Sequence, residues 1–84
     1  MERRLRNDPV QVEIRDASPI GFRWDEREYE VVTLLKMLAL VRPAQDVDTQ
    51  LWQVRARSGD RPAKTFELEC DHGSWRVAAL WCAR

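Results

Sequence analysis

Apolar and polar residues alternate along several short stretches of this chain, and a large aromatic ring stands in most of them. The clearest examples are Phe22 and Trp24, Trp52 and Val54, and Phe66 and Leu68. Successive side chains of a strand point to opposite faces, so a period of two predicts a sheet with one apolar face and one charged face. We therefore expect a mostly β fold of about six short antiparallel strands, curled into a small barrel or rolled sheet.

The chain has 84 residues, which is close to the smallest size at which a single core is sufficient. We predict a flexible polar arm over residues 1–8 and a single small β domain over residues 9–84. The four tryptophans are expected to turn inward together, since each can bury about 150–250 Å². They are Trp24, Trp52, Trp75 and Trp81.

Close turns are expected to join the first strands. A two-residue loop at Glu26 and Arg27 would place Trp24 opposite Tyr29, with the third strand starting near residue 28. Such loops favour Asn-Gly or Gly-Gly, so a longer loop or a bulge stays open as an alternative.

The second half of the chain predicts two further hairpins. A loop over residues 58–64 would place Arg55 opposite Glu67, and His72 and Gly73 would form a two-residue turn. Two cross-strand pairs follow from that turn: Glu69 with Arg76, and Cys70 with Trp75.

The segment after Tyr29 fits two periodicities. Strand alternation continues to about Leu35, but apolar residues also recur at helical spacing. These are Val31, Leu34, Leu35, Leu38 and Val41. We expect strand to Leu35, and then either a short helix near residues 36–42 or continued strand.

Few side chains suited to catalysis are present. His72 is the only histidine and stands in a predicted turn, so the usual general base or metal ligand is scarce. The carboxylates Glu67, Glu69 and Asp71 share one strand face, where arginines of neighbouring strands are expected to neutralise them. We predict a protein that is not an enzyme and that uses no cofactor and no metal.

Two strands carry apolar residues where a polar face is expected. The residues concerned are Ala78, Leu80 and Cys82 in the last strand, and Val32 and Leu34 in the third. A strand that is apolar on both faces must be covered on both, either by the segment from Leu38 to Val41 or by another protein chain. This predicts a binding or adaptor module that acts through a protein partner or as a homodimer.

Basic residues suggest an alternative function. They are Arg3, Arg4, Arg6, Arg55 and Arg57. Small curved sheets bind single-stranded nucleic acid through basic tracks combined with exposed aromatic rings. Against this, the formal net charge is zero and the rings are expected in the core. A nucleic-acid-binding accessory protein is therefore kept as the second hypothesis.

Nothing in the sequence predicts a membrane protein. The first six residues are basic but no apolar run follows them, and the longest apolar stretch, residues 31–41, is interrupted by Thr33 and Lys36. Two cysteines are too few for a disulfide scaffold. We expect a cytoplasmic location with free thiols.

The order of the aromatic motifs resembles an uncharacterised family of small bacterial β domains. The motifs are Phe22-Arg23-Trp24, Tyr29-Glu30-Val31, Trp52-Gln53-Val54, Phe66-Glu67-Leu68, Trp75-Arg76-Val77 and Leu80-Trp81. The resemblance covers about residues 9–82 and departs from the family at Asp25-Glu26-Arg27, where glycine is usual. Members also occur as tails of translesion-polymerase-like proteins, so the resemblance implies a possible context in DNA repair. It transfers no site residue.

Overall fold

In the computed structural model, which describes residues 2–42 and 47–82, the chain forms one seven-stranded antiparallel sheet. The strands are β1 (Glu2–Pro9), β2 (Gln11–Arg15), β3 (Ser18–Trp24), β4 (Arg27–Arg42), β5 (Val47–Arg57), β6 (Lys64–Asp71) and β7 (Ser74–Cys82). The all-β prediction is confirmed.

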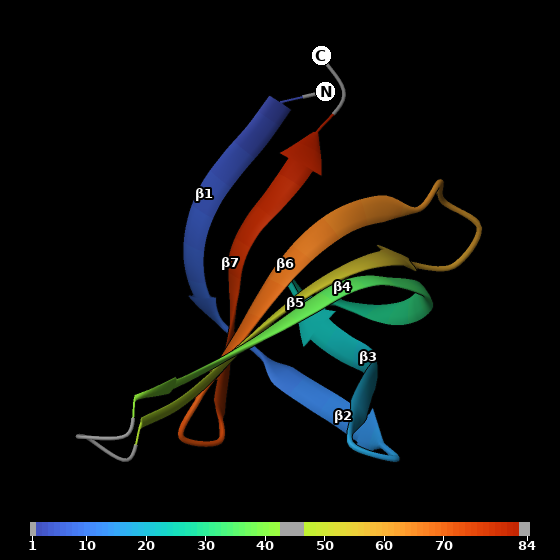
Figure 1. Cartoon of the computed structure of the whole chain (residues 1–84). Coiled ribbons are helices and arrows are strands. Elements are labelled where there is room, and N and C mark those ends of the chain that lie inside the picture. Colours follow the sequence, from blue (N-terminus) through green and yellow to red (C-terminus); the bar gives the residue numbers. More distant parts are fainter. Residues whose placement is uncertain (1, 43–46, 83–84) are drawn as a thin grey trace.

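The sheet is curled into a half-barrel, as Figure 1 shows. Its strand order is β1-β7-β6-β5-β4-β3-β2, so the two ends of the sheet are strands that follow each other in the chain. The chain bends at Pro9 and Val10, where the Val10 amide donates to the Trp75 carbonyl at 3.1 Å. The passage from β1 to β2 therefore draws the two sheet ends toward each other.

The prediction of a flexible arm over residues 1–8 is wrong for the described residues 2–8. These residues form β1, which pairs with β7 from Glu2 opposite Cys82 to Pro9 opposite Arg76. Most β1 side chains are exposed, so the segment shows no apolar alternation. The segment is ordered by backbone pairing with β7, and the pattern of side chains in the sequence does not reveal such pairing.

The core lies on the concave face of the sheet. Its most deeply buried side chains are Val54, Phe66, Leu68 and Val77. Beside them Phe22 stacks on Tyr29, with ring centroids 5.2 Å apart, and both rings meet the edge of Phe66 at 5.0 Å. Aromatic contacts between β3, β4 and β6 thus close the curve of the sheet.

A bulge in β7 decides which of its side chains enter the core. Val77 pairs with Leu68 and Ala79 pairs with Glu67, so Ala78 is an extra residue without a partner on β6. Directly opposed residues share a face, so the side chains change sides across Ala78. Leu80, only 5% exposed, consequently lies in the core.

The same switch corrects the prediction that all four tryptophans point inward. Trp52 is buried in the core, and Trp24 and Trp75 pack against it half-buried. Trp81 follows the bulge and lies on the convex face, opposite Arg3 of β1. The sequence pattern missed this because one extra residue inverts every later position in a strand.

The helix considered for residues 36–42 is wrong, because β4 continues as strand to Arg42. Its pairing with β5 shifts register twice, between Val31 and Thr33 and between Leu34 and Lys36. Each bulge uses one extra residue, so the core face of β4 carries Val31, Leu34 and Met37 at intervals of three. That spacing imitates a helix.

Two predicted registers are displaced by two residues, although the faces are right. The β3–β4 turn is Asp25-Glu26, with positive φ at both residues, so Phe22 and not Trp24 lies opposite Tyr29. Arg55 pairs with Thr65 and not with Glu67. The turn at His72-Gly73 is confirmed, as are its cross-strand pairs Glu69 with Arg76 and Cys70 with Trp75.

Candidate functional site

The edge of β4 is the most unusual part of the sheet. β3 pairs with β4 only as far as Glu30, whereas β5 pairs with the opposite edge as far as Arg42. From Val31 onward, no strand of the described chain lies along the second edge of β4. The far part of the β4–β5 hairpin projects from the curved sheet in Figure 1.

This open edge carries large apolar side chains that are 42–49% exposed. They are Val32, Leu34, Leu35, Met37 and Leu38. Leu34 and Met37 lie opposite Val54 and Trp52 and so belong to the concave face. Leu38 lies opposite Leu51 on the convex face, so apolar surface flanks the open edge on both sides.

The predicted partner surface divides in two in the structure. Val32 and Leu34 are exposed on β4, as that prediction requires. Leu80 is wrong as a surface residue because the bulge turns it into the core. Ala78 and Cys82 are half-buried, with Cys82 packed against the core. Leu35, Met37 and Leu38 were missed. In the sequence, Leu35 and Leu38 are noticeable for their helical spacing.

The predicted nucleic-acid residues lie on both faces of the sheet. Arg3 is on the convex face, where its guanidinium donates to the Glu67 carboxylate at 2.8 Å and lies 5.7 Å from the Trp81 ring centroid. Arg55 shares that face, opposite Thr65, and Arg57 lies opposite Glu30. The structure therefore does not unite all five predicted arginines.

Arg4 and Arg6 instead line a hollow of about 320 Å³ at one mouth of the half-barrel. Three further cationic side chains line the same hollow. They are Arg27 at the start of β4, Arg61 in the β5–β6 loop and Lys64 at the start of β6. Asp25 is the one carboxylate among the described residues that line this hollow. Folding thus gathers positive charge from strands that are distant in sequence.

A second hollow, of about 520 Å³, adjoins the same loop on the side of Trp81. Arg55, Arg61, Lys64 and Trp81 line it. Arg61 and Lys64 therefore belong to both hollows and join them across the rim of the sheet. We call the six cationic side chains of the two hollows the basic rim. They are Arg4, Arg6, Arg27, Arg55, Arg61 and Lys64.

Asp8 fixes the aromatic wall of this mouth. Its carboxylate accepts hydrogen bonds from the Trp24 indole at 2.8 Å and from the Arg6 guanidinium at 3.0 Å. These bonds, the indole bond first, lower the pKa of Asp8 below its ordinary value. The Arg6 guanidinium also lies 5.6 Å from the centroid of the Trp24 ring.

The carboxylate row on β6 is largely engaged in pairs. Glu69 accepts from Arg76 at 2.7 Å, as predicted, whereas the partner of Glu67 is Arg3 and not Arg55. Asp71 accepts from the Thr49 hydroxyl at 3.3 Å. Within the described residues, no group of three metal-ligating side chains comes together.

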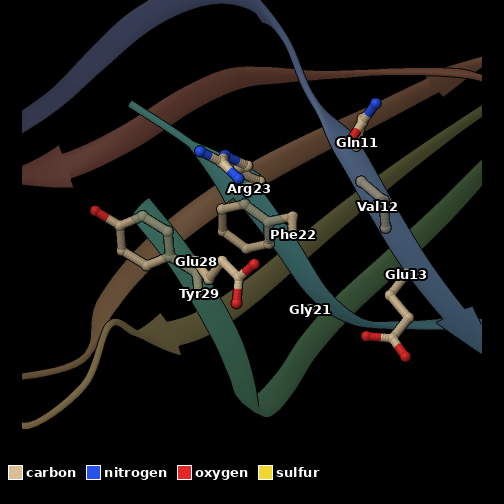
Figure 2. A pocket seen from close by; sticks show the side chains of 8 residues that line it. All are labelled: Gln11, Val12, Glu13, Gly21, Phe22, Arg23, Glu28 and Tyr29. Carbon is tan, nitrogen blue, oxygen red and sulfur yellow. The ribbon is translucent and has the colours of Figure 1, made fainter. Parts of the chain in front are cut away.

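A further hollow, of about 350 Å³, lies over β2, β3 and the start of β4 (Figure 2). Gly21 lines it, and a Cβ atom at this position would lie 3.1 Å from the Tyr29 carbonyl oxygen, a tight contact with backbone. Its charges are mixed, because Arg23 stands among Glu13 and Glu28. This hollow therefore offers no preference for one sign of ligand charge.

Comparison with known proteins finds no family model, no curated protein and no solved structure that matches this chain. No helix that could cross a membrane occurs in the described residues, which are all strand, turn or loop.

Proposed function

We propose that this protein is a non-enzymatic binding module that self-associates by pairing the open edge of β4 with the same edge of a second copy. The observation that carries the proposal is the coincidence of an unpaired strand edge with exposed apolar side chains on both of its faces. An unpaired edge presents a row of backbone N–H and C=O groups that can extend a sheet.

The geometry of β4 suits strand addition. From Lys36 to Arg42 its pairing with β5 is regular, over seven residues, which is about the length of an average strand. A strand laid along this edge would cover Met37 on one face and Leu38 on the other.

A second copy fits this edge better than a foreign strand. An isologous interface brings the same patch from both partners, so the apolar side chains of each copy cover those of the other. The chain has a formal net charge of zero, so two copies do not repel each other at long range. Lys36 is the only charged residue between Val31 and Ala39.

The small core supplies a further reason for self-association. Among the residues whose burial the structure describes, the hydrophobic core has only ten buried members, and small domains commonly gain stability from oligomerisation. The non-enzymatic part of the proposal is supported by the β6 carboxylates, since Glu67 and Glu69 are held by Arg3 and Arg76.

Sedimentation equilibrium over a wide concentration range tests the proposal. We expect a monomer–dimer equilibrium. The double variant Leu35→Lys/Leu38→Lys should lower the dimerisation affinity by roughly 100-fold or more, because burial of each leucine side chain in the interface would contribute about 1.5–3 kcal/mol. The matched control is Leu5→Lys/Ile14→Lys, which alters exposed apolar residues of β1 and β2.

The control variant should dimerise like the parent protein. A chain that is monomeric at every concentration, or a control that weakens association as much as the β4 variant, would overturn self-association through this edge.

A further inference from the structure

We infer that the basic rim binds the sugar–phosphate backbone of single-stranded nucleic acid. The nucleic acid would run from the mouth of the half-barrel, past the β5–β6 loop, to Trp81 on the convex face. This inference is independent of the β4 edge. Of the five predicted arginines, Arg4, Arg6 and Arg55 belong to the basic rim, whereas Arg3 and Arg57 do not. Arg27, Arg61 and Lys64 complete it.

The charge balance of the rim carries the first step. Six cationic side chains line the two hollows, against the single carboxylate of Asp25. Arg6 is engaged by Asp8 at 3.0 Å, and Arg4 lies 3.9 Å from Glu2. For the other four cations, no carboxylate among the described residues comes within salt-bridge distance. In a chain of zero net charge, this concentration marks a site for an anion.

The shape of the rim favours a chain-like anion over a compact one. The two hollows measure about 320 and 520 Å³, and Arg61 and Lys64 line both. A single phosphate could contact only one hollow at a time. A strand of linked phosphates could follow the cations from Arg4 and Arg6, past the β5–β6 loop, to Arg55 on the convex face.

Trp81 favours a nucleic acid among such anions. Its ring is half-buried on the convex face and lines the second hollow beside Arg55 and Lys64. Single-strand sites combine a basic track with aromatic rings on which bases stack. Trp24 serves differently, because Asp8, Tyr29 and Phe66 already hold its ring as a wall of the first hollow.

Fluorescence anisotropy with a labelled oligothymidylate tests the inference. We expect binding at about 50 mM salt that weakens steeply as salt is raised, because phosphate contacts release counterions. The double variant Arg61→Ala/Lys64→Ala should bind roughly tenfold more weakly. It should also lower the slope of log affinity against log salt by about two, one for each lost contact.

The matched control is Arg15→Ala/Arg23→Ala, which removes the same charge from exposed positions of β2 and β3. It should bind like the parent chain. Equal thermal unfolding of both double variants would show that the rim variant is folded. A third variant, Trp81→Ala, should weaken binding to the oligonucleotide more than binding to inorganic pyrophosphate.

Four results would overturn the inference. They are no binding at low salt, equal loss in the rim and control variants, a duplex that binds more tightly than the single strand, and a mononucleotide or pyrophosphate that binds as tightly as the oligonucleotide. None of them bears on dimerisation, which sedimentation measures separately.

Discussion

Strands β4 and β7 both carry apolar residues on their two faces, but these residues are mostly exposed in β4 and are buried or half-buried in β7. Each strand contains a bulge that moves side chains from one face to the other. β7 lies between β1 and β6, and its bulge places Leu80 in the core. β4 loses its neighbour β3 after Glu30, so its apolar residues stay exposed.

In this chain, apolar residues after a bulge are buried or half-buried in the strand that is paired on both edges, and stay exposed in the strand that has one open edge. In β7 the extra residue Ala78 is matched by a register shift in β1 between Leu5 and Asp8. In β4 only β5 is present to accommodate the bulges. The apolar side chains of β4 therefore stay exposed, which is why we propose the interface at that strand.

Deleting Ala78 should break the comparison most severely. Without the extra residue, the positions after it change faces, so Leu80 would point to solvent or β7 would lose its pairing. We expect loss of the cooperative unfolding transition and of the near-ultraviolet circular dichroism of the tryptophans. Deleting Asp60 from the exposed β5–β6 loop is the control and should leave both signals in place. Retained cooperativity after loss of Ala78 would contradict our account of the bulge.

Substituting one leucine in each strand gives a graded version of this test. Leu80→Ala should lower the free energy of unfolding by about 2–5 kcal/mol, because it opens a cavity in the core. Leu34→Ala, at a side chain 49% exposed, should cost less than about 1 kcal/mol in the monomer. Urea denaturation measures both, and similar losses would show that the two strands are buried alike.

The smallest expected effect concerns the contact of Asp8 in β1 with Trp24 in β3. The folded-state pKa of Asp8 is lowered by Trp24 and Arg6, so its contribution to stability is present above its unfolded pKa and is lost as pH falls through the folded value. Because the carboxylate is part exposed, we expect less than about 1 kcal/mol.

Asp8→Asn should therefore flatten part of the loss of stability below about pH 4, the region of an ordinary aspartate pKa, in urea denaturation repeated across pH. Asp60→Asn in the loop is the matched control. An acid dependence that is identical in parent and Asp8→Asn proteins would show that this contact does not contribute.

The residues of each turn determined whether the register of its two strands could be predicted. Glycine at position 73 identifies the His72-Gly73 turn, where both residues have positive φ, and the pairing that follows was right. Asp25-Glu26 also adopts positive φ but contains no glycine, so the sequence could not distinguish it from Glu26-Arg27. A shift of two residues preserves the faces, which is why the core was predicted more accurately than the register.

The candidate surfaces were harder to predict than the core. Val32 and Leu34 could be identified because they interrupt an alternating pattern, but Leu80 interrupts it equally and is buried. Only the position of a strand within the sheet separates these cases. The basic rim combines residues from β1, β4 and the β5–β6 region, so no local pattern marks it.

The pairing of Glu2 with Cys82 links the two extremities of the described chain. The neighbour of β1 is β7, so the five other strands lie between the two partners in the sequence. Contacts of such long sequence separation form slowly, because a large loop must close before they are made. We therefore expect the pairing of β1 with β7 to be a late step of folding, and the step that completes the curled sheet.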